Sequence, residues 1–420
     1  MSLALTGQEL SFQRRVRTFA ERHLKPIAAK IEAGEYFPED FLRALGKNKF
    51  LGAPFSKSDG GLALGWVSET IVAEEISAVS GAAEMARLAS AALYSAPLAN
   101  FGNNVQKKRF LRSVISGEKI GALALTEPQA GSDAGSIITR ARHDGRDFVL
   151  NGEKRFITNG GVADYLFLFA VTDPSKPARS GLSAFVIPRN SKGLEVVRAY
   201  GLLGMRGANV AHLRLRNVRV PRENLVGVLH RGFSIILDEL DRERPAVAAG
   251  MMGIARSAFE EAVRYSSTRE QFGRPIRDFE GVSFKIADMA VKLAASRLLI
   301  IHAARVLDRR SPARKEGAIA KLYSTEAAFD VAHESLQVHG GLGYTKDLPI
   351  ERYFRDARFM MIGGGTSEIM RYIIQREVYK EMGRLSSCYR LLLREVTRDF
   401  SRFQAVGRST KAPLVCPLLR

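Results

Sequence analysis

IGALALTEP (residues 120–128), DFVLNGEKRFITNG (147–160) and DYLFLFAVTD (164–173) open a block of short segments that decides the fold. The segments are apolar or alternate between apolar and polar residues, and glycine, proline, asparagine and aspartate separate them, as in strands joined by turns. LSAFVIP, LEVVRAY and AHLRLRNVRVP continue the pattern to about residue 227. Several short strands at such regular spacing predict a small β-barrel or β-sandwich.

Helical patterns flank this block on both sides. Thr6 and Glu9 have the spacing of an N-terminal capping box, and the apolar residues after them recur at helical intervals. Further helices are expected after Pro38, as two alanine-rich helices ending at Gly102, and at 106–116. Beyond the strands, long amphipathic helices are expected at about 234–266, 279–309, 312–338 and 366–383, and a shorter one at about 386–404. Long helices joined by short glycine-rich breaks predict an up-down bundle.

The sequence therefore predicts an α+β multidomain protein. We place an N-terminal all-helical domain at residues 1–121, a central β-barrel or sandwich domain at 122–229, a C-terminal four-helix bundle at 230–383 and a basic tail at 384–420.

The composition is that of a soluble globular protein: 420 residues, 46% hydrophobic and 25% charged. The formal net charge of +19 favours an acidic partner, such as nucleic acid, an anionic membrane surface, an acidic carrier protein or an anionic cofactor, although a basic tail explains much of it. The two cysteines, Cys388 and Cys416, form no disulfide framework, and we expect no metal site. No signal peptide or membrane-spanning run is evident, so we expect a cytoplasmic protein.

Glu243 stands inside LDELDRERPAVAAGMMGIA (residues 237–255), within one of the expected long helices. The residues that share its helix face are small and apolar: Ala246, Val247, Gly250, Met251 and Ile254. A carboxylate in apolar surroundings has a raised pKa, which suits the removal of a weakly acidic C–H proton. The alternative is a structural acid that complements the helix dipole or pairs with Arg242 or Arg244.

The loop TEPQAGSD (residues 126–133) follows directly on an expected strand. Its glycine, serine and threonine could bring amide and hydroxyl donors close to a ring or a phosphate. Turn chemistry alone would equally explain Pro128, Gly131 and Asp133. Taken alone, the loop indicates either a turn or a ligand contact.

Six segments in the same order, across residues 5 to about 383, resemble the acyl-CoA dehydrogenase family. ALTEPQAGSD (124–133) and GEKRFITNG (152–160) look like the two flavin signatures of the family's β-domain. GMRG at 204–207, YSSTREQFGRPI at 265–276, QVHGGLGY and ERYFRDAR are similar to its later segments. The resemblance leaves out the tail and implies FAD as the cofactor.

The resemblance also implies which residues contact FAD. Within one subunit these would be Thr126, Ser132, Phe156 and Thr158, of which the two threonines and Phe156 meet the isoalloxazine ring and Ser132 the pyrophosphate. Arg269 and Phe272 look like residues that meet the FAD of a neighbouring subunit, which implies a homodimer or homotetramer. Further FAD contacts would be Gln337, Gly340, Gly341, Thr366 and Glu368.

The position of the catalytic base departs from the family's commonest pattern. Most members carry a glutamate immediately before a Gly-Thr pair, where this sequence has Gly364 before Gly365 and Thr366. A subset that includes isovaleryl-CoA and long-chain acyl-CoA dehydrogenases instead places the base on a helix, ahead of an arginine. That position falls on Glu243. Glu368 is the rival, but it matches a FAD contact.

The implied reaction is α,β-dehydrogenation of an acyl thioester. Glu243 would remove the α-proton, flavin N5 would accept the β-hydride, and the amide of Gly364 would stabilise charge on the thioester oxygen. Asp241 and Arg244 match positions around the pantetheine arm, and Tyr94 falls in the segment that lines the acyl pocket. The expected acceptor is electron-transfer flavoprotein.

Three alternatives stay open from the sequence. The thioester is either an acyl-CoA, with a branched or a short to medium acyl group, or an acyl or prolyl group on a carrier protein. The enzyme is either a dehydrogenase or an oxidase. A nucleic-acid-associated protein shares the fold, but the flavin signatures and Glu243 favour an enzyme.

Overall fold

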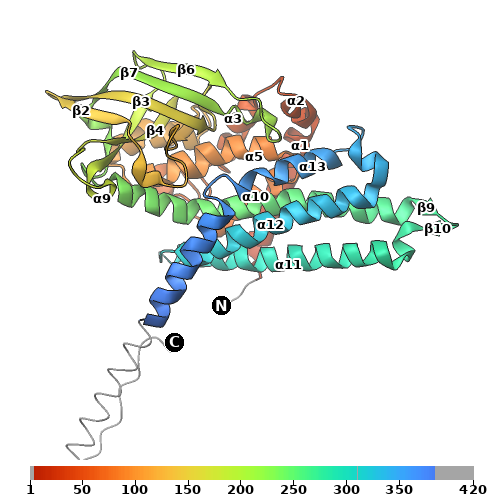
Figure 1. Cartoon of the computed structure of the whole chain (residues 1–420). Coiled ribbons are helices and arrows are strands. Elements are labelled where there is room, and N and C mark those ends of the chain that lie inside the picture. The colour runs from red at the N-terminus through yellow and green to blue at the C-terminus, as the bar shows by residue number, and fades with distance from the viewer. Residues whose placement is uncertain (1–3, 310, 384–420) are drawn as a thin grey trace, which may run out of the picture.

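The computed structural model describes residues 4–309 and 311–383, and helices, a sheet and helices again follow one another along the chain. Figure 1 shows the β-domain and the N-terminal helices lying against a layer of long helices from the C-terminal half. The predicted architecture is confirmed, whereas the domain boundaries stay a prediction. The helix predicted at about 386–404 lies outside the described residues.

The N-terminal part consists of short helices. They are α1 Gly7–His23, α2 Ala28–Glu32, α3 Glu39–Lys47, α4 Trp66–Ser77, α5 Gly81–Leu88, α6 Ser95–Phe101, α7 Asn104–Gln106 and α8 Arg112–Ile115. The predicted capping box is present, because the Thr6 amide donates to Glu9 Oε2 (2.8 Å) and the Glu9 amide donates to Thr6 Oγ1 (3.3 Å). A π-helical segment, Ala89–Tyr94, joins α5 to α6 and lets the alanine-rich helix run on to Phe101.

The central part is one eight-stranded sheet in the described chain. Its strands are β1 Gly121–Ala124, β2 Arg140–Asp144, β3 Asp147–Ile157, β4 Tyr165–Val171, β5 Leu182–Pro188, β6 Leu194–Ala199, β7 Ala211–Pro221 and β8 Leu225–Val226. The strand order is β6-β7-β3-β2-β4-β5-β8, with β1 paired in parallel to β4. The sequence predicted six of these strands; β2 and β8 are additional.

The C-terminal part contains the predicted bundle: α10 Gly232–Thr268, α11 Glu280–Asp308, α12 Arg314–His339 and a helix over residues 367–383. A two-stranded hairpin, β9 Glu270–Gln271 and β10 Arg274–Pro275, joins α10 to α11 and projects from the end of the bundle in Figure 1. The helix α13 Ile350–Ala357 was not predicted as a separate element. At Gly232 a Cβ would lie 2.8 Å from the Ser183 carbonyl carbon, so glycine permits the close approach of α10 to β5.

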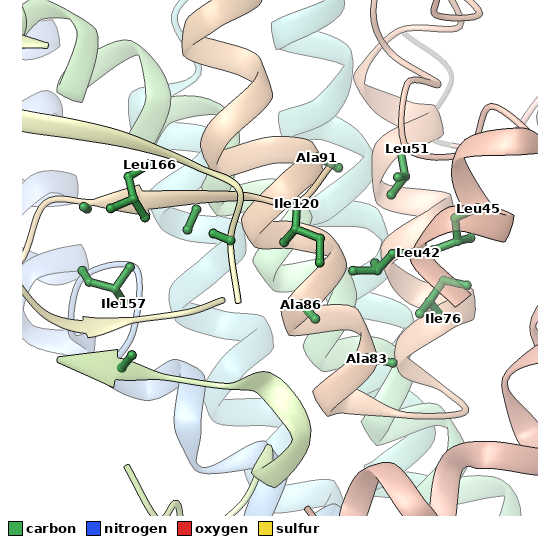
Figure 2. Close-up of a cluster of buried hydrophobic side chains, with 14 of the residues drawn as sticks. Leu42, Leu45, Leu51, Ile76, Ala83, Ala86, Ala91, Ile120, Ile157 and Leu166 are labelled. Atoms are coloured by element: carbon green, nitrogen blue, oxygen red, sulfur yellow. The ribbon is translucent and has the colours of Figure 1, made fainter. Parts of the chain in front are cut away.

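A continuous apolar core joins the N-terminal helices to the sheet. Figure 2 shows Leu42 and Leu45 of α3 facing the same cluster as Ile157 of β3 and Leu166 of β4. Ile120, directly before β1, lies between the two groups of side chains. Because buried apolar area is the main favourable term in folding, this core fixes the helices relative to the sheet. Within the described residues, no helix is long and apolar enough to cross a membrane.

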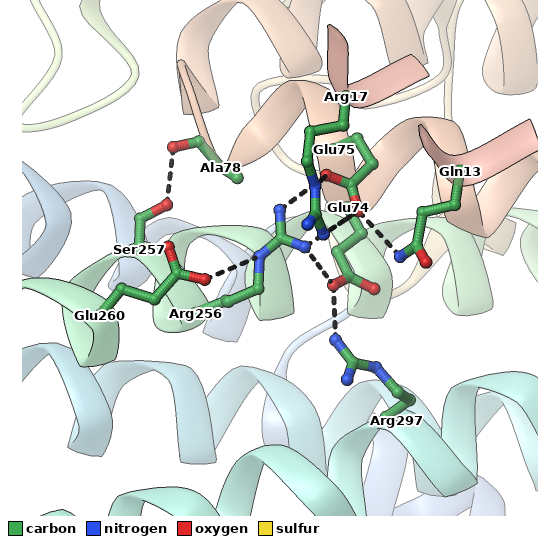
Figure 3. Close-up of polar contacts among 9 residues, drawn as sticks. All are labelled: Gln13, Arg17, Glu74, Glu75, Ala78, Arg256, Ser257, Glu260 and Arg297. Atoms are coloured by element: carbon green, nitrogen blue, oxygen red, sulfur yellow. Dashed lines mark hydrogen bonds and ion pairs between the residues drawn. The ribbon is translucent and has the colours of Figure 1, made fainter. Parts of the chain in front are cut away.

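A buried ion network joins α1, α4, α10 and α11 (Figure 3). The Glu75 carboxylate is fully buried and accepts hydrogen bonds from Arg17 and Arg256, with distances of 2.8–3.1 Å. Glu74 pairs with Arg256 at 3.1 Å and with Arg297 at 2.7 Å. Burial alone would raise the pKa of Glu75, but the hydrogen bonds from the two arginines hold it below its ordinary value.

We expect Glu75→Gln to destabilise the protein by about 3–5 kcal/mol, because it leaves the buried Arg256 guanidinium without its main counter-charge. The measurement is the midpoint of urea unfolding. The matched control is Glu260→Gln, an exposed partner of the same arginine, for which the loss should be below about 1 kcal/mol. Since the pKa of Glu75 is lowered in the folded state, this stabilisation should be present above the unfolded pKa and lost as the pH falls through the folded one. Equal losses in both variants would contradict a structural role for the network.

Candidate functional site

Glu243 lies in the buried first half of α10, with 6% of its surface exposed. The five residues predicted to share its face are all buried: Ala246, Val247, Gly250, Met251 and Ile254. Burial raises the pKa of Glu243, and the nearby charges of Arg244 and Lys321 only partly oppose that shift. The predicted dry environment of this carboxylate is thus present.

The glycine loop before the last described helix lies directly against Glu243. A Cβ on Gly364 would lie 2.8 Å from Glu243 Oε1, and the φ angle of Gly364 is +64°, a value that L side chains rarely adopt. The structure therefore brings together the two residues that the sequence singled out for catalysis. Any side chain at position 364 would occupy the space next to this carboxylate.

Lys321 of α12 is a buried site residue that sequence reasoning missed. Its Nζ donates a hydrogen bond to the carbonyl oxygen of Gly365, which ties the glycine loop to α12. Burial lowers the pKa of Lys321 to about 8, although the charge of Glu243 opposes that shift. A signal was available in the sequence, because Lys321 shares its helix face with Gly317, Ser324 and Ala328, all small and buried.

Asp241 and Arg244 form an ion cluster with Arg314 of α12. Asp241 Oδ1 accepts from Arg244 at 3.2 Å and Asp241 Oδ2 accepts from Arg314 at 3.3 Å. Arg314 also lines a cleft of about 700 Å³ between the start of α10 and the helix over residues 367–383. The other residues of the cleft are Arg179, Phe233, Ser234, Leu237, Gln375, Arg376, Glu377, Tyr379 and Lys380. The cleft is therefore basic and leads toward the predicted pantetheine positions.

The two predicted flavin signatures lie side by side. The buried Lys154 Nζ donates to Glu127 Oε1 (2.7 Å) and to the Leu125 carbonyl (3.0 Å). The Arg155 amide donates to the carbonyl of Thr126 over 2.8 Å. These bonds hold the loop after β1 against the end of β3, so Thr126 lies close to the second signature. Ser132 is exposed in the same loop.

Phe156 projects from the end of β3 with 60% of its surface exposed and a φ angle of +56°. Its ring packs on Tyr200, with 4.9 Å between ring centroids. The Tyr200 hydroxyl is buried and has no partner among the described residues. Thr158 follows Phe156 and is half-buried. The exposed Phe156 ring could stack on a planar ligand, and the unpartnered Tyr200 hydroxyl could bond to a polar edge of it. Isoalloxazine has both features.

A second group of predicted FAD contacts lies where the C-terminal ends of α10 and α12 meet. Arg269 and Phe272 belong to the hairpin after α10, and Phe272 is 94% exposed. Gln337, Gly340 and Gly341 lie at the C-terminal end of α12. This end lies beside the C-terminal end of α10, where the His339 ring stacks on the Tyr265 ring with 4.5 Å between ring centroids. Nothing within 4 Å opposes a Cβ at Gly340 or Gly341, so both glycines leave open space at the surface. This group suits a ligand held from outside the subunit.

Thr366 and Glu368 cap the helix over residues 367–383. The Thr366 hydroxyl accepts from the Ile369 amide over 3.3 Å. Glu368 is exposed, and its own backbone amide and the Thr366 hydroxyl lower its pKa. An exposed carboxylate with a lowered pKa is a weaker candidate base than the buried Glu243.

Tyr94 ends the π-helical segment Ala89–Tyr94. It is fully buried in an aromatic cluster with Tyr165 and Phe167 of β4, and its hydroxyl donates to the Phe110 carbonyl over 3.4 Å. The contacts described for it are those of core packing, so its place in the acyl pocket stays a prediction from the resemblance. Within the described residues, no group of acidic, histidine or cysteine side chains could hold a metal ion.

Three family models match the chain in sequence order. They are described as the N-terminal domain (residues 6–118), the middle domain (122–218) and the C-terminal domain (230–379) of acyl-CoA dehydrogenase. The chain is 39% identical over 380 residues to the short-chain specific acyl-CoA dehydrogenase of Clostridium acetobutylicum, which covers 90% of this chain and 100% of that protein.

Solved structures with the same fold are similar over most of the chain. Butyryl-CoA dehydrogenase from Megasphaera elsdenii superposes with a TM-score of 0.88 at 33% identity, covering 90% of this chain and 100% of that one. A structure described as the electron transferring flavoprotein of Acidaminococcus fermentans contains a chain with a TM-score of 0.88 and 35% identity, covering 90% and 99%.

Proposed function

The chain belongs to the acyl-CoA dehydrogenase family, and we propose that Glu243 is the base with which it removes the α-proton of its acyl-CoA substrate. The protein is an FAD-dependent enzyme that dehydrogenates acyl-CoA thioesters. The single observation that supports the assignment of the base is the position of Glu243. Its side chain is buried, its pKa is raised, and its Oε1 would lie in contact with a Cβ on residue 364.

In the proposed reaction, α10 supplies the base and the glycine loop supplies a hydrogen-bond donor. Glu243 takes the α-proton, which is weakly acidic, so a carboxylate with a raised pKa matches the task. The Gly364 amide donates to the thioester oxygen, where negative charge develops. Lys321 holds the loop in position through its hydrogen bond to the Gly365 carbonyl. FAD, when bound, supplies the acceptor for the β-hydride.

We propose that FAD is held by two sets of residues. Within the subunit, Thr126, Ser132, Phe156 and Thr158 would contact it, with Thr366 and Glu368 at the glycine loop. The second set, Arg269, Phe272, Gln337, Gly340 and Gly341, lies at the far end of the bundle and would serve the FAD of a neighbouring subunit. A ligand shared in this way requires an oligomer.

An exposed apolar stripe on α11 supports that oligomer. Phe284, Val291 and Leu298 follow one another at intervals of seven residues and are all exposed. Because seven residues are close to two helical turns, these side chains form one line along the helix surface. Such a line on a water-facing helix is typical of a helix–helix interface.

We therefore expect Val291→Glu to shift the protein toward a smaller assembly and to lower its FAD content, because a charge in the stripe opposes burial. Analytical ultracentrifugation gives the mass, and the visible flavin absorbance gives the cofactor content. Val105→Glu is the control, since Val105 is as exposed but lies on α7 in the N-terminal part. An unchanged mass for Val291→Glu would contradict an interface on this face.

We also propose that the basic cleft takes the phosphates of CoA. Arg179, Arg314, Arg376 and Lys380 line it, and guanidinium groups suit phosphate recognition. Arg376→Gln should raise KM for an acyl-CoA by about fivefold to tenfold, which corresponds to roughly 1–1.4 kcal/mol. The same acyl group on N-acetylcysteamine, which lacks the nucleotide, should show an unchanged KM. An equal rise for both thioesters would contradict this assignment.

The experiment that tests the proposed function is an anaerobic titration of the FAD-loaded enzyme with a panel of acyl-CoA thioesters. We expect at least one short or branched acyl-CoA to bleach the flavin, and electron-transfer flavoprotein to restore its colour faster than oxygen does. Bleaching by a carrier-bound thioester alone would favour the carrier-protein alternative, and rapid oxygen consumption an oxidase. Tight DNA binding that falls steeply with salt, without bleaching, would favour the nucleic-acid-binding alternative.

A further inference from the structure

Lys321 differs from the other buried cations of the chain in its partner. In the described ranges 4–309 and 311–383, four lysine and arginine side chains are buried: Arg87, Lys154, Arg244 and Lys321. The first three are each paired with a carboxylate, at distances of 2.7–3.2 Å. Lys321 has no ion pair within these ranges and donates to the carbonyl oxygen of Gly365. An ammonium group buried without a direct counter-ion destabilises a protein, so stability does not explain its position.

The Lys321 ammonium and the Glu243 carboxylate meet neighbouring residues of the glycine loop. Lys321 bonds to Gly365, whereas Glu243 Oε1 would lie 2.8 Å from a Cβ on Gly364. Residues 363–365 carry no side chain that could anchor the loop, and the φ angles of Gly364 and Gly365 are +64° and +91°. Because a glycine backbone is free to adopt many conformations, the bond from Lys321 restricts where Gly364 stands relative to the base.

Lys321 and Glu243 also stabilise each other's charged forms. Burial lowers the pKa of Lys321 to about 8, and Glu243 is the charge that most opposes this shift. The lysine therefore still carries its proton at neutral pH. Burial raises the pKa of Glu243, and the charges of Arg244 and Lys321 oppose that rise. Removing the lysine charge would move Glu243 further toward its protonated form, which accepts no proton from a substrate.

The other charged groups around this pair do not replace Lys321. They are Arg244 and Glu239 on α10, the half-buried Glu326 on α12 and the exposed Glu368 after the loop. Arg244 already bonds to Asp241 over 3.2 Å. Glu239 is 1% exposed, and burial together with the charge of Glu243 raises its pKa well above the ordinary value, so it stays neutral when Glu243 is ionised. In the described chain, Lys321 is thus the cation of this site that no other carboxylate binds.

We propose that Lys321 is a positioning residue for the base: its ammonium group keeps Glu243 ionised at neutral pH and fixes the loop that carries Gly364. The inference rests on the proposed function, in which Glu243 removes the α-proton. Lys321 acts through these two groups and needs no contact of its own with the substrate or the flavin.

The test is the pH dependence of flavin reduction by a saturating acyl-CoA, followed by anaerobic stopped flow. Lys321→Met removes the charge and the donor at nearly the same side-chain length. We expect the midpoint of the acid limb to rise by about 1–2 pH units, the usual effect of losing an opposite charge near a carboxylate. The limiting rate above that midpoint should fall about tenfold, because the loop loses its tie to α12.

Two further substitutions separate the charge from the hydrogen bond. Lys321→Gln keeps a donor without the charge, so it should show the same shift in midpoint with a smaller loss in limiting rate. Lys321→Arg keeps both the charge and a donor, so its midpoint should equal that of the wild type. Lys315→Met is the matched control, because Lys315 lies on the same helix and pairs with the exposed Glu381. It removes one positive charge from α12 and should leave the midpoint unchanged.

FAD content and melting temperature are compared first, and the glutamine and arginine variants decide the question if Lys321→Met does not bind FAD. An unchanged midpoint in FAD-loaded Lys321→Gln or Lys321→Met would overturn the inference, since a purely structural lysine changes stability and FAD content alone. A shift of equal size in Lys315→Met would overturn it as well. The proposed function fails separately, if Glu243→Gln reduces flavin as fast as the wild-type enzyme.

Discussion

Replacing Glu243 with glutamine is expected to lower the rate constant of flavin reduction by acyl-CoA by about 10³- to 10⁴-fold, while FAD stays bound. The estimate follows from the usual contribution of a positioned general base, about 10²- to 10⁴-fold, placed near its upper end because no second carboxylate stands at position 364. The measurement is anaerobic stopped-flow reduction at saturating substrate, which separates the chemical step from reoxidation.

The pH dependence of this rate offers a second readout. Burial raises the pKa of Glu243 above its ordinary value of 4.5, and only the deprotonated form accepts a proton. Flavin reduction by the wild-type enzyme should therefore slow as the pH falls through that raised pKa. Glu260→Gln is the matched control, because Glu260 is an exposed carboxylate on the same helix and belongs to neither the proposed FAD set nor the base. A large loss in Glu368→Gln with little change in Glu243→Gln would reverse the assignment.

Moving the base across the site is expected to have the second-largest effect. Gly364→Glu alone should slow flavin reduction by about 10²-fold, because its side chain would start 2.8 Å from Glu243 Oε1 and adds a like charge in a dry site. The φ angle of +64° adds strain of roughly 1–2 kcal/mol for any L residue.

The double variant Glu243→Gly, Gly364→Glu removes both the clash and the like charge. We expect it to reduce flavin at least about tenfold faster than Glu243→Gly alone, since the new carboxylate reaches the space that the old one left. The FAD content and melting temperature of all three variants should be compared first. A double variant that is folded, loaded with FAD and no faster than Glu243→Gly would show that the two positions do not face the same substrate atom.

Most of the fold was predictable because long amphipathic helices and apolar strands carry periodic patterns. The misses have physical causes. Strand β2, RARHD, is short and largely exposed, so it lacks apolar alternation. Strand β8 has only two residues and depends on pairing with β5. Helix α13 is brief and rich in charged residues, and tertiary packing of Ile350 and Tyr353 rather than propensity sustains it.

The candidate site was predictable where chemistry and pattern coincide. Glu243 was identified as a carboxylate on an apolar helix face, and Gly364 by the absence of a side chain where relatives carry one. Lys321 was missed because a lysine within a helix is usually exposed, although the small residues on its helix face, Gly317, Ser324 and Ala328, were a sign of its burial. Tyr94 was placed in the acyl pocket by resemblance; it packs in an aromatic cluster, and its place in the pocket stays a prediction.

The most direct measurement of the role of Glu243 is hydrogen exchange at the α-carbon of a thioester that cannot be dehydrogenated. Acetyl-CoA has α-hydrogens and no β-carbon, so exchange of its methyl protons in D₂O reports proton removal without electron transfer. Nuclear magnetic resonance should show exchange above background with the wild-type enzyme and with the control Glu260→Gln, and background exchange with Glu243→Gln. Equal exchange by the wild-type enzyme and the FAD-loaded Glu243→Gln variant would contradict the assignment of Glu243 as the base.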